Sequence, residues 1–395
     1  MADAERAWST EVNGGVYVRN LMLTNFRSYT RASVAPSGTT PLVVLTGHNG
    51  AGKTNVLEAL SFLAPGRGLR QASVAEVAKQ GSTSPWVVAA TLGVSGDDIK
   101  VGTGQDADAT DGAGKRVVRM DGQTVSSSNM LGDRWSVTWL TPQMDRLFIE
   151  GPSSRRRFLD RLVLGLYPDH SRQVGAYERV MRERNRLLGD RGMHADAAWL
   201  SAIEARMAEH AVAVATARLD YAGQLAGQLE AAEDGPFPKA ELAIDGWLEG
   251  LLADGMAAVE AETLYRDKLL SLRGRDMANG RTGEGVHRTD LIVTHAPKAM
   301  RADLCSTGEQ KALLVALVLA NAKLQSAMKG QAPLMLMDEV AAHLDESRRA
   351  ALFAALASLG GQCWLTGTDR SLFAALEGQA EFFDVCDGSI QPALQ

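Results

Sequence analysis

Hydrophobic and polar positions in the first third of the chain follow the pattern of strands arranged around one helix. Residues 16–23 are rich in β-forming side chains with a loose alternation, and the apolar run 42–45 is typical of a buried strand. Residues 55–63 have helical spacing and end before a Pro-Gly pair. Three further strands, with a turn at Asp121-Gly122, are predicted at 86–94, 99–102 and 116–120.

The middle of the chain changes to a helical pattern. Residues 155–189 and 195–233 are rich in Ala, Leu and Arg, with apolar residues at helical intervals. The glycine-containing break at 189–192 predicts that these two long helices fold back on each other as an antiparallel pair. Gly235-Pro236 ends the pair, and a third helix is predicted at 256–272.

From residue 283 onward the pattern again alternates between helix and strand. A long apolar helix is predicted at 311–327, a buried strand at 334–337, a helix at 345–359 and a strand at 362–365. The chain is therefore predicted to be an α/β protein with a helical arm inserted into it. The predicted divisions are 1–154, 155–284 and 285–395, the first and last forming one domain.

Composition is that of an ordinary globular protein, with 395 residues, 45% hydrophobic and 22% charged residues. The three cysteines have no metal-ligand spacing, which favours a reduced, cytoplasmic setting. No secretory signal is recognisable in residues 1–15, and the longest apolar run, 312–320, is too short to span a bilayer. Residues 106–112 resemble a calcium loop only faintly, and a solvated hairpin tip is the better interpretation.

The net charge of −6 hides two basic segments. Residues 151–191 carry ten arginines against five acidic residues, and residues 266–301 carry eight basic against four acidic residues. Such segments could attract a polyanion, although solvated arginines on exposed helices explain them equally well. The run Arg155, Arg156 and Arg157 could touch DNA or anchor the arm through ion pairs. Trp135 and Trp139 are interpreted as core residues rather than a base-stacking platform.

Residues 47–54, Gly-His-Asn-Gly-Ala-Gly-Lys-Thr, fit the phosphate-loop pattern and lie between a predicted strand and a predicted helix. Glycines let backbone N–H groups turn toward phosphates, and the helix N-terminus adds the positive end of its dipole. In this pattern Lys53 reaches the β- and γ-phosphates and Thr54 ligates Mg²⁺. The predicted nucleotide-binding residues of the loop are Gly47, His48, Asn49, Gly50, Ala51, Gly52, Lys53 and Thr54.

The buried strand 334–337 ends in Asp338 and Glu339. The first carboxylate is predicted to bind the magnesium, and the second to polarise a water for attack on the γ-phosphate. Lys53 and Glu339 are therefore candidate catalytic residues.

Several motifs together resemble the RecF family of bacterial DNA-repair ATPases, within the ABC/SMC-like class. They cover nearly the whole chain in the family's order: residues 21–29, 52–60, 152–160, 285–291, 305–309 and 338–345. The resemblance implies an ABC-type α/β ATPase head, made of mixed sheets with flanking helices, and an inserted helical arm. About 285 residues separate Lys53 from Asp338, which leaves room for that arm.

The resemblance also implies roles for further residues. Gln143 matches the loop residue that senses magnesium and the attacking water, so it is both a metal-ligand and a catalytic candidate. Ser306 and Gly308 match the signature that contacts the nucleotide of the other protomer, and Asp345 closes a loop at the dimer seam. Either Arg67 or Arg70 is expected to follow the phosphate-loop helix as the nucleotide-sensing arginine. The position after the last strand reads Thr366-Gly367-Thr368 and has no histidine, which is consistent with slow turnover.

By the same resemblance, ATP and Mg²⁺ are the expected cofactors, and ATP binding clamps a homodimer on double-stranded or gapped DNA. The expected partners are a RecR-type mediator and, indirectly, RecO and RecA, in gap repair, replication and the SOS response. Two alternatives remain open on the sequence. One is another SMC-like or overcoming-lysogeny-type DNA ATPase, and the other is the ATPase subunit of a transporter, which the long insertion disfavours.

Overall fold

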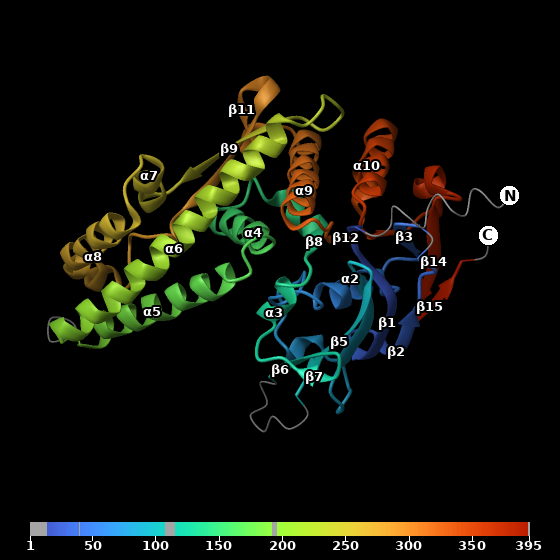
Figure 1. Cartoon of the computed structure of the whole chain (residues 1–395), viewed down its shortest axis with the longest axis horizontal. Coiled ribbons are helices and arrows are strands. Elements are labelled where there is room, and N and C mark those ends of the chain that lie inside the picture. Colours follow the sequence, from blue (N-terminus) through green and yellow to red (C-terminus); the bar gives the residue numbers. More distant parts are fainter. Residues whose placement is uncertain (1–13, 39, 107–114, 192–195, 394–395) are drawn as a thin grey trace. The chain divides into compact units, whose positions relative to one another are not determined.

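The computed structural model describes residues 14–38, 40–106, 115–191 and 196–393 (Figure 1). The chain forms two compact units. The first comprises residues 1–145, 234–237 and 314–395, and the second comprises 146–233 and 238–313. The predicted arm, 155–284, falls within the second unit except for residues 234–237, and that unit also takes in residues on both sides of it.

The first unit contains two six-stranded sheets. One is antiparallel, in the order β2-β1-β4-β5-β6-β7. Its strands are β1 (Val16–Phe26), β2 (Tyr29–Val34), β4 (Val87–Val94), β5 (Asp97–Gln105), β6 (Arg116–Met120) and β7 (Gln123–Thr124). The four strands predicted at 16–23, 86–94, 99–102 and 116–120 are therefore confirmed in this sheet. The fifth, the buried run 42–45, is confirmed in the second sheet. The calcium-like residues 107–112 lie outside the described residues.

The second sheet has the order β15-β14-β3-β13-β12-β8 and is parallel except at β15. Its strands are β3 (Leu42–Thr46), β8 (Val137–Leu140), β12 (Leu334–Met337), β13 (Cys363–Gly367), β14 (Ala380–Cys386) and β15 (Ser389–Pro392). The residues of β3, β12 and β13 are buried throughout, as expected for central parallel strands covered on both faces. Because parallel strands end at one edge, the loops after β3, β8, β12 and β13 gather there.

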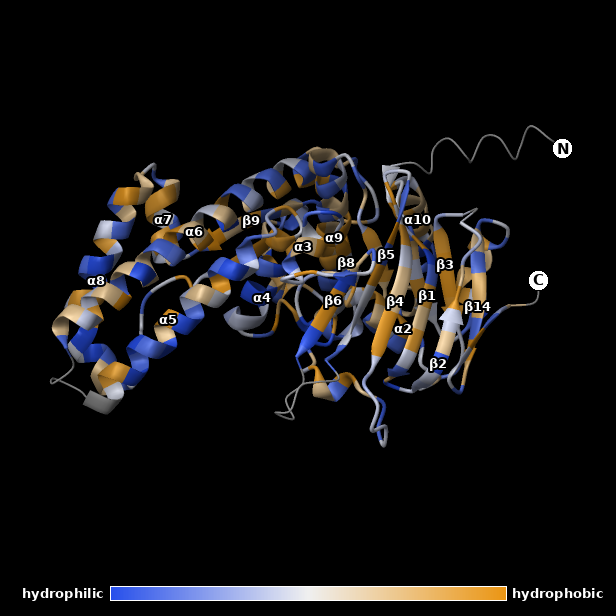
Figure 2. Ribbon diagram, turned by 60° about the horizontal axis from the view of Figure 1, so that its bottom comes forward, coloured by the Kyte–Doolittle hydropathy of each residue, from blue (hydrophilic) through white to orange (hydrophobic). Residues whose placement is uncertain are grey.

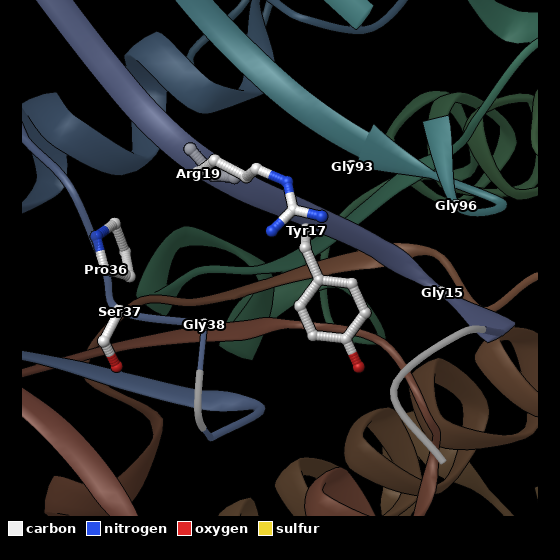
Figure 3. A pocket seen from close by; sticks show the side chains of 9 residues that line it. Gly15, Tyr17, Arg19, Pro36, Ser37, Gly38, Gly93 and Gly96 are labelled. Atoms are coloured by element: carbon white, nitrogen blue, oxygen red, sulfur yellow. The ribbon is translucent and has the colours of Figure 1, made fainter. Parts of the chain in front are cut away.

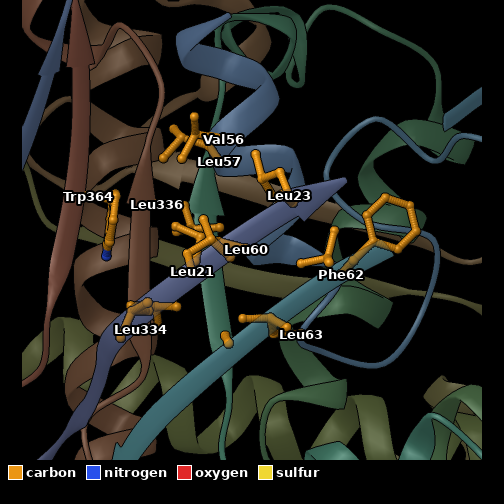
Figure 4. Close-up of a cluster of buried hydrophobic side chains, with 14 of the residues drawn as sticks. Leu21, Leu23, Val56, Leu57, Leu60, Phe62, Leu63, Leu334, Leu336 and Trp364 are labelled. Atoms are coloured by element: carbon orange, nitrogen blue, oxygen red, sulfur yellow. The ribbon is translucent and has the colours of Figure 1, made fainter. Parts of the chain in front are cut away.

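The main core of this unit lies between the two sheets, around helix α2 (Lys53–Ser61). Figure 4 shows Leu21 and Leu23 of β1 and residues of α2 beside Leu334 of β12 and Trp364 of β13. Trp135 and Trp139 belong to the same core, which confirms their interpretation as core residues. Packing α2 on both sheets anchors the start of this helix beside the strand ends.

The other helices of the first unit are short or flank the parallel sheet. They are α3 (Asn129–Gly132), α10 (Glu346–Ser358) and the 3-10 segments Ala75–Val77, Pro142–Arg146, Val340–His343 and Arg370–Leu376. Helix α9 (Thr307–Lys329) begins in the second unit and continues into the first. It is long and apolar enough to cross a membrane by composition, but 72% of its most apolar window is buried inside the protein.

The second unit combines helices with a small sheet in the order β11-β10-β9. Its elements are α4 (Pro152–Leu164), α5 (His170–Arg191), α6 (Ala197–Glu230), β9 (Ala240–Asp245), α7 (Trp247–Ala253), α8 (Ala258–Asn279), β10 (Asp290–His295), β11 (Met300–Arg301) and two 3-10 turns, Ala296–Lys298 and Ala302–Leu304. Figure 2 shows mixed hydrophobic and hydrophilic colouring along α5, α6 and α8, in line with helices buried on one side.

Two expectations about these helices need correction. The helix predicted at 155–189 is two helices, α4 and α5, because Pro168 cannot donate a helical hydrogen bond and disfavours helical geometry in the residue before it. Helix α5 also runs past the predicted break to Arg191. The third helix, predicted at 256–272, extends to Asn279 and ends at Gly280, whose φ of 66° is a left-handed cap.

Candidate nucleotide site

The phosphate loop connects the buried end of β3 to the first turn of α2. Two of its glycines are required by close contacts. A Cβ atom on Gly47 would lie 2.2 Å from the carbonyl oxygen of Val385, and one on Gly52 would lie 2.6 Å from the hydroxyl of Tyr29. The φ of Gly52 is 114°, which side chains rarely tolerate. The buried Tyr29 hydroxyl donates to the carbonyl of Gly52 (3.1 Å), so it braces the loop where the helix begins.

The Lys53 side chain is bonded to the backbone of the phosphate loop. Its Nζ donates to the carbonyl oxygens of Gly47 (2.8 Å) and His48 (2.9 Å). Its side chain is only 4% exposed, and this burial lowers its pKa, while the charges of Glu339 and Asp338 act in the opposite direction. A phosphate in the loop would offer the ammonium stronger, charged acceptors than these two carbonyls.

Asp338 stands at the end of β12, against two threonine hydroxyls. Thr54 Oγ1 donates to its Oδ1 (2.9 Å), and so does Thr366 Oγ1 at the end of β13 (2.8 Å). Burial raises the pKa of Asp338, and the hydrogen bonds from Thr366 and Thr54 partly oppose that rise. A carboxylate and a hydroxyl directed at each other are oxygen ligands of the kind that Mg²⁺ prefers, so these residues fit the metal.

Glu339 follows at once and is held in a left-handed conformation with φ 50°. Its backbone N–H donates to Thr366 Oγ1 (2.9 Å), so one hydroxyl joins both acidic residues. The structure thus brings together Lys53, Thr54 and the two carboxylates that the sequence predicted. The sequence did not indicate this role for Thr366, although its place directly after the predicted strand 362–365 was a usable signal.

Gln143 lies in the 3-10 segment after β8 and is exposed. Strand β8 pairs with β12, and the Asp338 N–H donates to the carbonyl of Leu140 at the end of β8 (2.9 Å). Gln143 therefore follows the neighbouring strand at the edge that carries Asp338.

Of the two candidate arginines, Arg70 is the one bonded to helix α2. It donates to Asn55 Oδ1 (2.9 Å) and to the fully buried Glu58 (2.9 Å), both on α2. Its charge lowers the pKa of Asp338, opposing the effect of burial. Arg67 is exposed on the same loop. Arg27 also pairs with Glu58, so that one buried carboxylate holds two guanidinium groups.

The signature residues lie in the second unit, at the start of α9. The Ser306 backbone N–H donates to Glu309 (3.0 Å), and the Glu309 N–H donates weakly to Ser306 Oγ (3.4 Å). This reciprocal arrangement is a capping box, which explains why Ser and Glu stand three residues apart. Ser306 and Gly308 are exposed. Asp345, the last residue of the loop after β12, caps α10 by accepting from the Arg348 N–H (2.8 Å).

The three consecutive arginines of α4 have different environments. Arg155 makes two hydrogen bonds to Asp290 (2.8 and 2.7 Å), and Arg156 donates to the carbonyl of Thr289 (2.7 Å). Arg157 is exposed and donates to Ser154 (3.0 Å). Arg155 and Arg156 therefore bind the start of β10, and Arg157 is the arginine of this run that faces solvent.

A separate pocket of about 290 Å³ in the first unit is lined by Tyr17, Arg19 and residues 36–38 (Figure 3). Ser37 and Gly38 donate to Glu381, whose partner in the sheet is Val43 near the start of β3. The phosphate loop follows the other end of β3, so this pocket is not part of the nucleotide site.

Known proteins resemble this chain over nearly its full length. The profile of the family described as RecF/RecN/SMC N terminal domain matches residues 17–384. The protein named DNA replication and repair protein RecF from Allorhizobium ampelinum is 48% identical over 375 residues, 95% of this chain and 98% of that protein. Its namesake from Brucella suis biovar 1 is 49% identical over 377 residues, 95% of this chain and 96% of that protein.

Solved structures show the same fold at low identity. The recombination mediator protein RecF with ATP, of the RecFOR pathway, superposes with a TM-score of 0.82 at 19% identity, covering 96% of this chain and 98% of that one. The Smc head of Pyrococcus furiosus, with an extended coiled coil, gives a TM-score of 0.50 at 15% identity, covering 96% of both chains. The predicted ABC-type ATPase head is thereby confirmed. The chain belongs to the RecF/RecN/SMC N-terminal domain family, and within it to RecF.

Proposed function

We propose that this protein is an ATP-dependent DNA-binding clamp of RecF type, acting in recombinational repair of single-strand gaps, in support of replication and in the SOS response. The carrying observation is the joint position of Lys53, Thr54, Asp338 and Glu339 at one sheet edge, with Lys53 turned into the loop. The RecF relatives, named for DNA replication and repair, supply the biological setting.

Each residue then has a defined task. Backbone N–H groups of residues 47–54 and the Lys53 ammonium bind the β- and γ-phosphates. Thr54, Asp338 and Gln143 would hold Mg²⁺, which would supply positive charge beside the phosphates. Glu339 accepts a proton from the attacking water. The Thr366 hydroxyl donates to the Asp338 carboxylate and accepts from the Glu339 backbone N–H, so it positions the carboxylate of the first residue and the main chain of the second.

Ser306 and Gly308 contact the nucleotide bound by a second copy, so that ATP joins two heads around duplex or gapped DNA. Slow, DNA-stimulated hydrolysis reopens the dimer. A RecR-type mediator, with RecO and RecA acting indirectly, is the expected partner set, in the cytoplasm.

Lys53→Met tests this function, with Lys100→Met as the matched control because Lys100 is exposed on β5. We expect Lys53→Met to abolish ATP binding and ATP-dependent binding of gapped DNA, measured by fluorescence anisotropy, while its circular dichroism spectrum is unchanged. Lys100→Met should behave as wild type. ATP-dependent DNA binding by Lys53→Met at wild-type affinity would contradict the proposal.

A further inference from the structure

A histidine, a cysteine and an aspartate from distant parts of the chain meet beside the phosphate loop. His48 is the second residue of that loop, and Cys386 and Asp387 stand at the end of β14. One ligand atom from each lies within 4.8 Å of the others. Among the residues that the structure describes, these three side chains form the group whose possible metal ligands lie this close together.

The backbone holds these residues in place. Strands β3 and β14 are paired in parallel up to Thr46 and Asp384, and Thr46 Oγ1 donates to Asp384 (2.7 Å). The loops that follow both strands therefore start side by side, and Gly47 rests against the carbonyl of Val385. Asp387 has a φ of 42° in the tight turn that pairs Cys386 with Ser389.

The imidazole of His48 is oriented as metal-binding histidines usually are. Its Nδ1 lies 2.9 Å from the carbonyl oxygen of Asn49, and its Nε2 lies 3.5 Å from Asp387 Oδ1. A carbonyl only accepts, so Nδ1 carries the proton, and neutral imidazole then has its lone pair on Nε2. A backbone carbonyl on one ring nitrogen commonly fixes the tautomer that ligates a metal through the other.

We propose that His48, Cys386 and Asp387 form a binding site for a divalent transition metal of the zinc type. Nitrogen, thiolate and carboxylate are the ligands that zinc uses, and three protein ligands leave a fourth position for water. Magnesium would not select a thiolate. The thiol releases its proton to solvent when the ion binds, so the negative charges of Cys386 and Asp387 balance the ion.

Occupancy of this site would tether the phosphate loop to the β14–β15 turn. The carbonyl of His48 accepts from Lys53, so the tethered residue is bonded to the lysine that must turn toward phosphate. The metal would restrict the motion of residues 47–50. This site contains neither Thr54 nor Asp338, the residues of the proposed magnesium site.

Cobalt(II) is the appropriate probe because its thiolate complexes absorb by charge transfer, and zinc, which is silent, displaces it. The full-length protein, kept reduced with a phosphine, is titrated with Co²⁺ and then with Zn²⁺. We expect a saturable charge-transfer band at one equivalent, which Cys386→Ser abolishes. His48→Ala and Asp387→Asn should each weaken Zn²⁺ binding at least about tenfold, equivalent to about 1.4 kcal/mol.

The controls are Cys305→Ser and His210→Ala, in the second unit, which should bind both metals as wild type does. Because the three ligands are exposed, their variants should retain the wild-type melting temperature. Hydrogen exchange supplies an independent readout: Zn²⁺ should slow the amides of residues 47–50 in wild type and not in Cys386→Ser. A charge-transfer band that survives in Cys386→Ser, or Zn²⁺ binding unchanged in all three variants, would overturn the proposal.

Discussion

Two charged residues of the nucleotide site are buried at a cost in free energy that bound ligands would reduce. Asp338 is 5% exposed and its pKa is raised by burial. Two hydroxyl donors offset only part of the cost of placing a carboxylate there. Burial likewise disfavours the charged form of Lys53, whose pKa it lowers. A cation beside Asp338 and a phosphate beside Lys53 would stabilise the charged form of each.

Because burial disfavours the ionised Asp338 carboxylate, we expect Asp338→Asn to stabilise the nucleotide-free protein. A carboxyl whose folded-state pKa is raised loses folding free energy as pH rises through that pKa, whereas an amide does not. The melting temperature of the variant should therefore exceed that of wild type at pH 7, and the difference should shrink toward about pH 4, near the ordinary pKa of aspartate. ATP hydrolysis should be lost at every pH.

Asp384→Asn is the control, because Asp384 is an exposed carboxylate on β14, a strand of the same sheet. Its melting difference from wild type should not grow with pH. Thermal melts without nucleotide between pH 4 and pH 8 decide the question. A melting temperature of Asp338→Asn that falls below wild type as pH rises would refute the argument.

At the scale of elements, helix α4 shows how tertiary contacts separate residues that are equivalent in sequence. Three consecutive arginines allowed both DNA contact and ion pairing. Helical geometry points neighbouring residues in different directions, about 100° apart, so the three cannot share one role. Arg155 is paired with Asp290, 135 residues away, and that contact has no local signal. Likewise, the three-stranded sheet of β9, β10 and β11 was not predicted: helices α7 and α8 separate β9 from β10 in the sequence, so their pairing has no local signal.

The contrast predicts different effects for two substitutions in α4. Arg155→Ala leaves Asp290 without its partner, so it should lower the free energy of unfolding by about 1 to 3 kcal/mol in urea denaturation. Arg157→Ala should change stability by less than about 0.5 kcal/mol. If this helix contacts DNA, Arg157→Ala should reduce the slope of log affinity against log salt by about 0.9.

The two measurements are made on the same proteins, so that folding and DNA binding are separated. Equal losses of stability in both variants would show that the ion pair with Asp290 is energetically unimportant. An unchanged salt slope in Arg157→Ala would remove α4 from the DNA-binding surface.

At the scale of the whole molecule, the phosphate loop and the signature belong to different compact units. In the proposed dimer each signature serves the nucleotide of the other copy, so two identical surfaces make two sites. The protein alone carries both halves of such a site, which makes complementation between mutants possible.

Lys53→Met removes the phosphate loop's charge, and the bulky Ser306→Arg blocks the signature, so each variant alone should be inactive. A mixed dimer contains one site with both halves intact. With random mixing half of the dimers are mixed, so about a quarter of wild-type sites should be restored. ATP-dependent dimerisation, by light scattering, should be measured with the ATPase rate. If a mixture restores neither, the site is not shared between copies.

The sequence by itself determined the chemistry that depends on local spacing. Residues 47–54 and the pair Asp338 and Glu339 were recognisable because a loop that cradles phosphate, and a buried strand that ends in acids, are made by consecutive residues. The strands β3, β12 and β13 were predictable for the same reason, since full burial requires an uninterrupted apolar run.

Only the tertiary structure decided which distant residues share a site. The Thr366 hydroxyl bonds to the Asp338 carboxylate and to the Glu339 backbone N–H, Tyr29 bonds to Gly52, and Cys386 lies beside His48, 338 residues away. The contacts of Thr366 and Cys386 follow from the order of strands in the parallel sheet, which places β14 beside β3 and β13 beside β12. Tyr29 comes from β2 of the antiparallel sheet. The order of the strands and the packing of the two sheets depend on the whole unit, so no pattern within one segment indicates them.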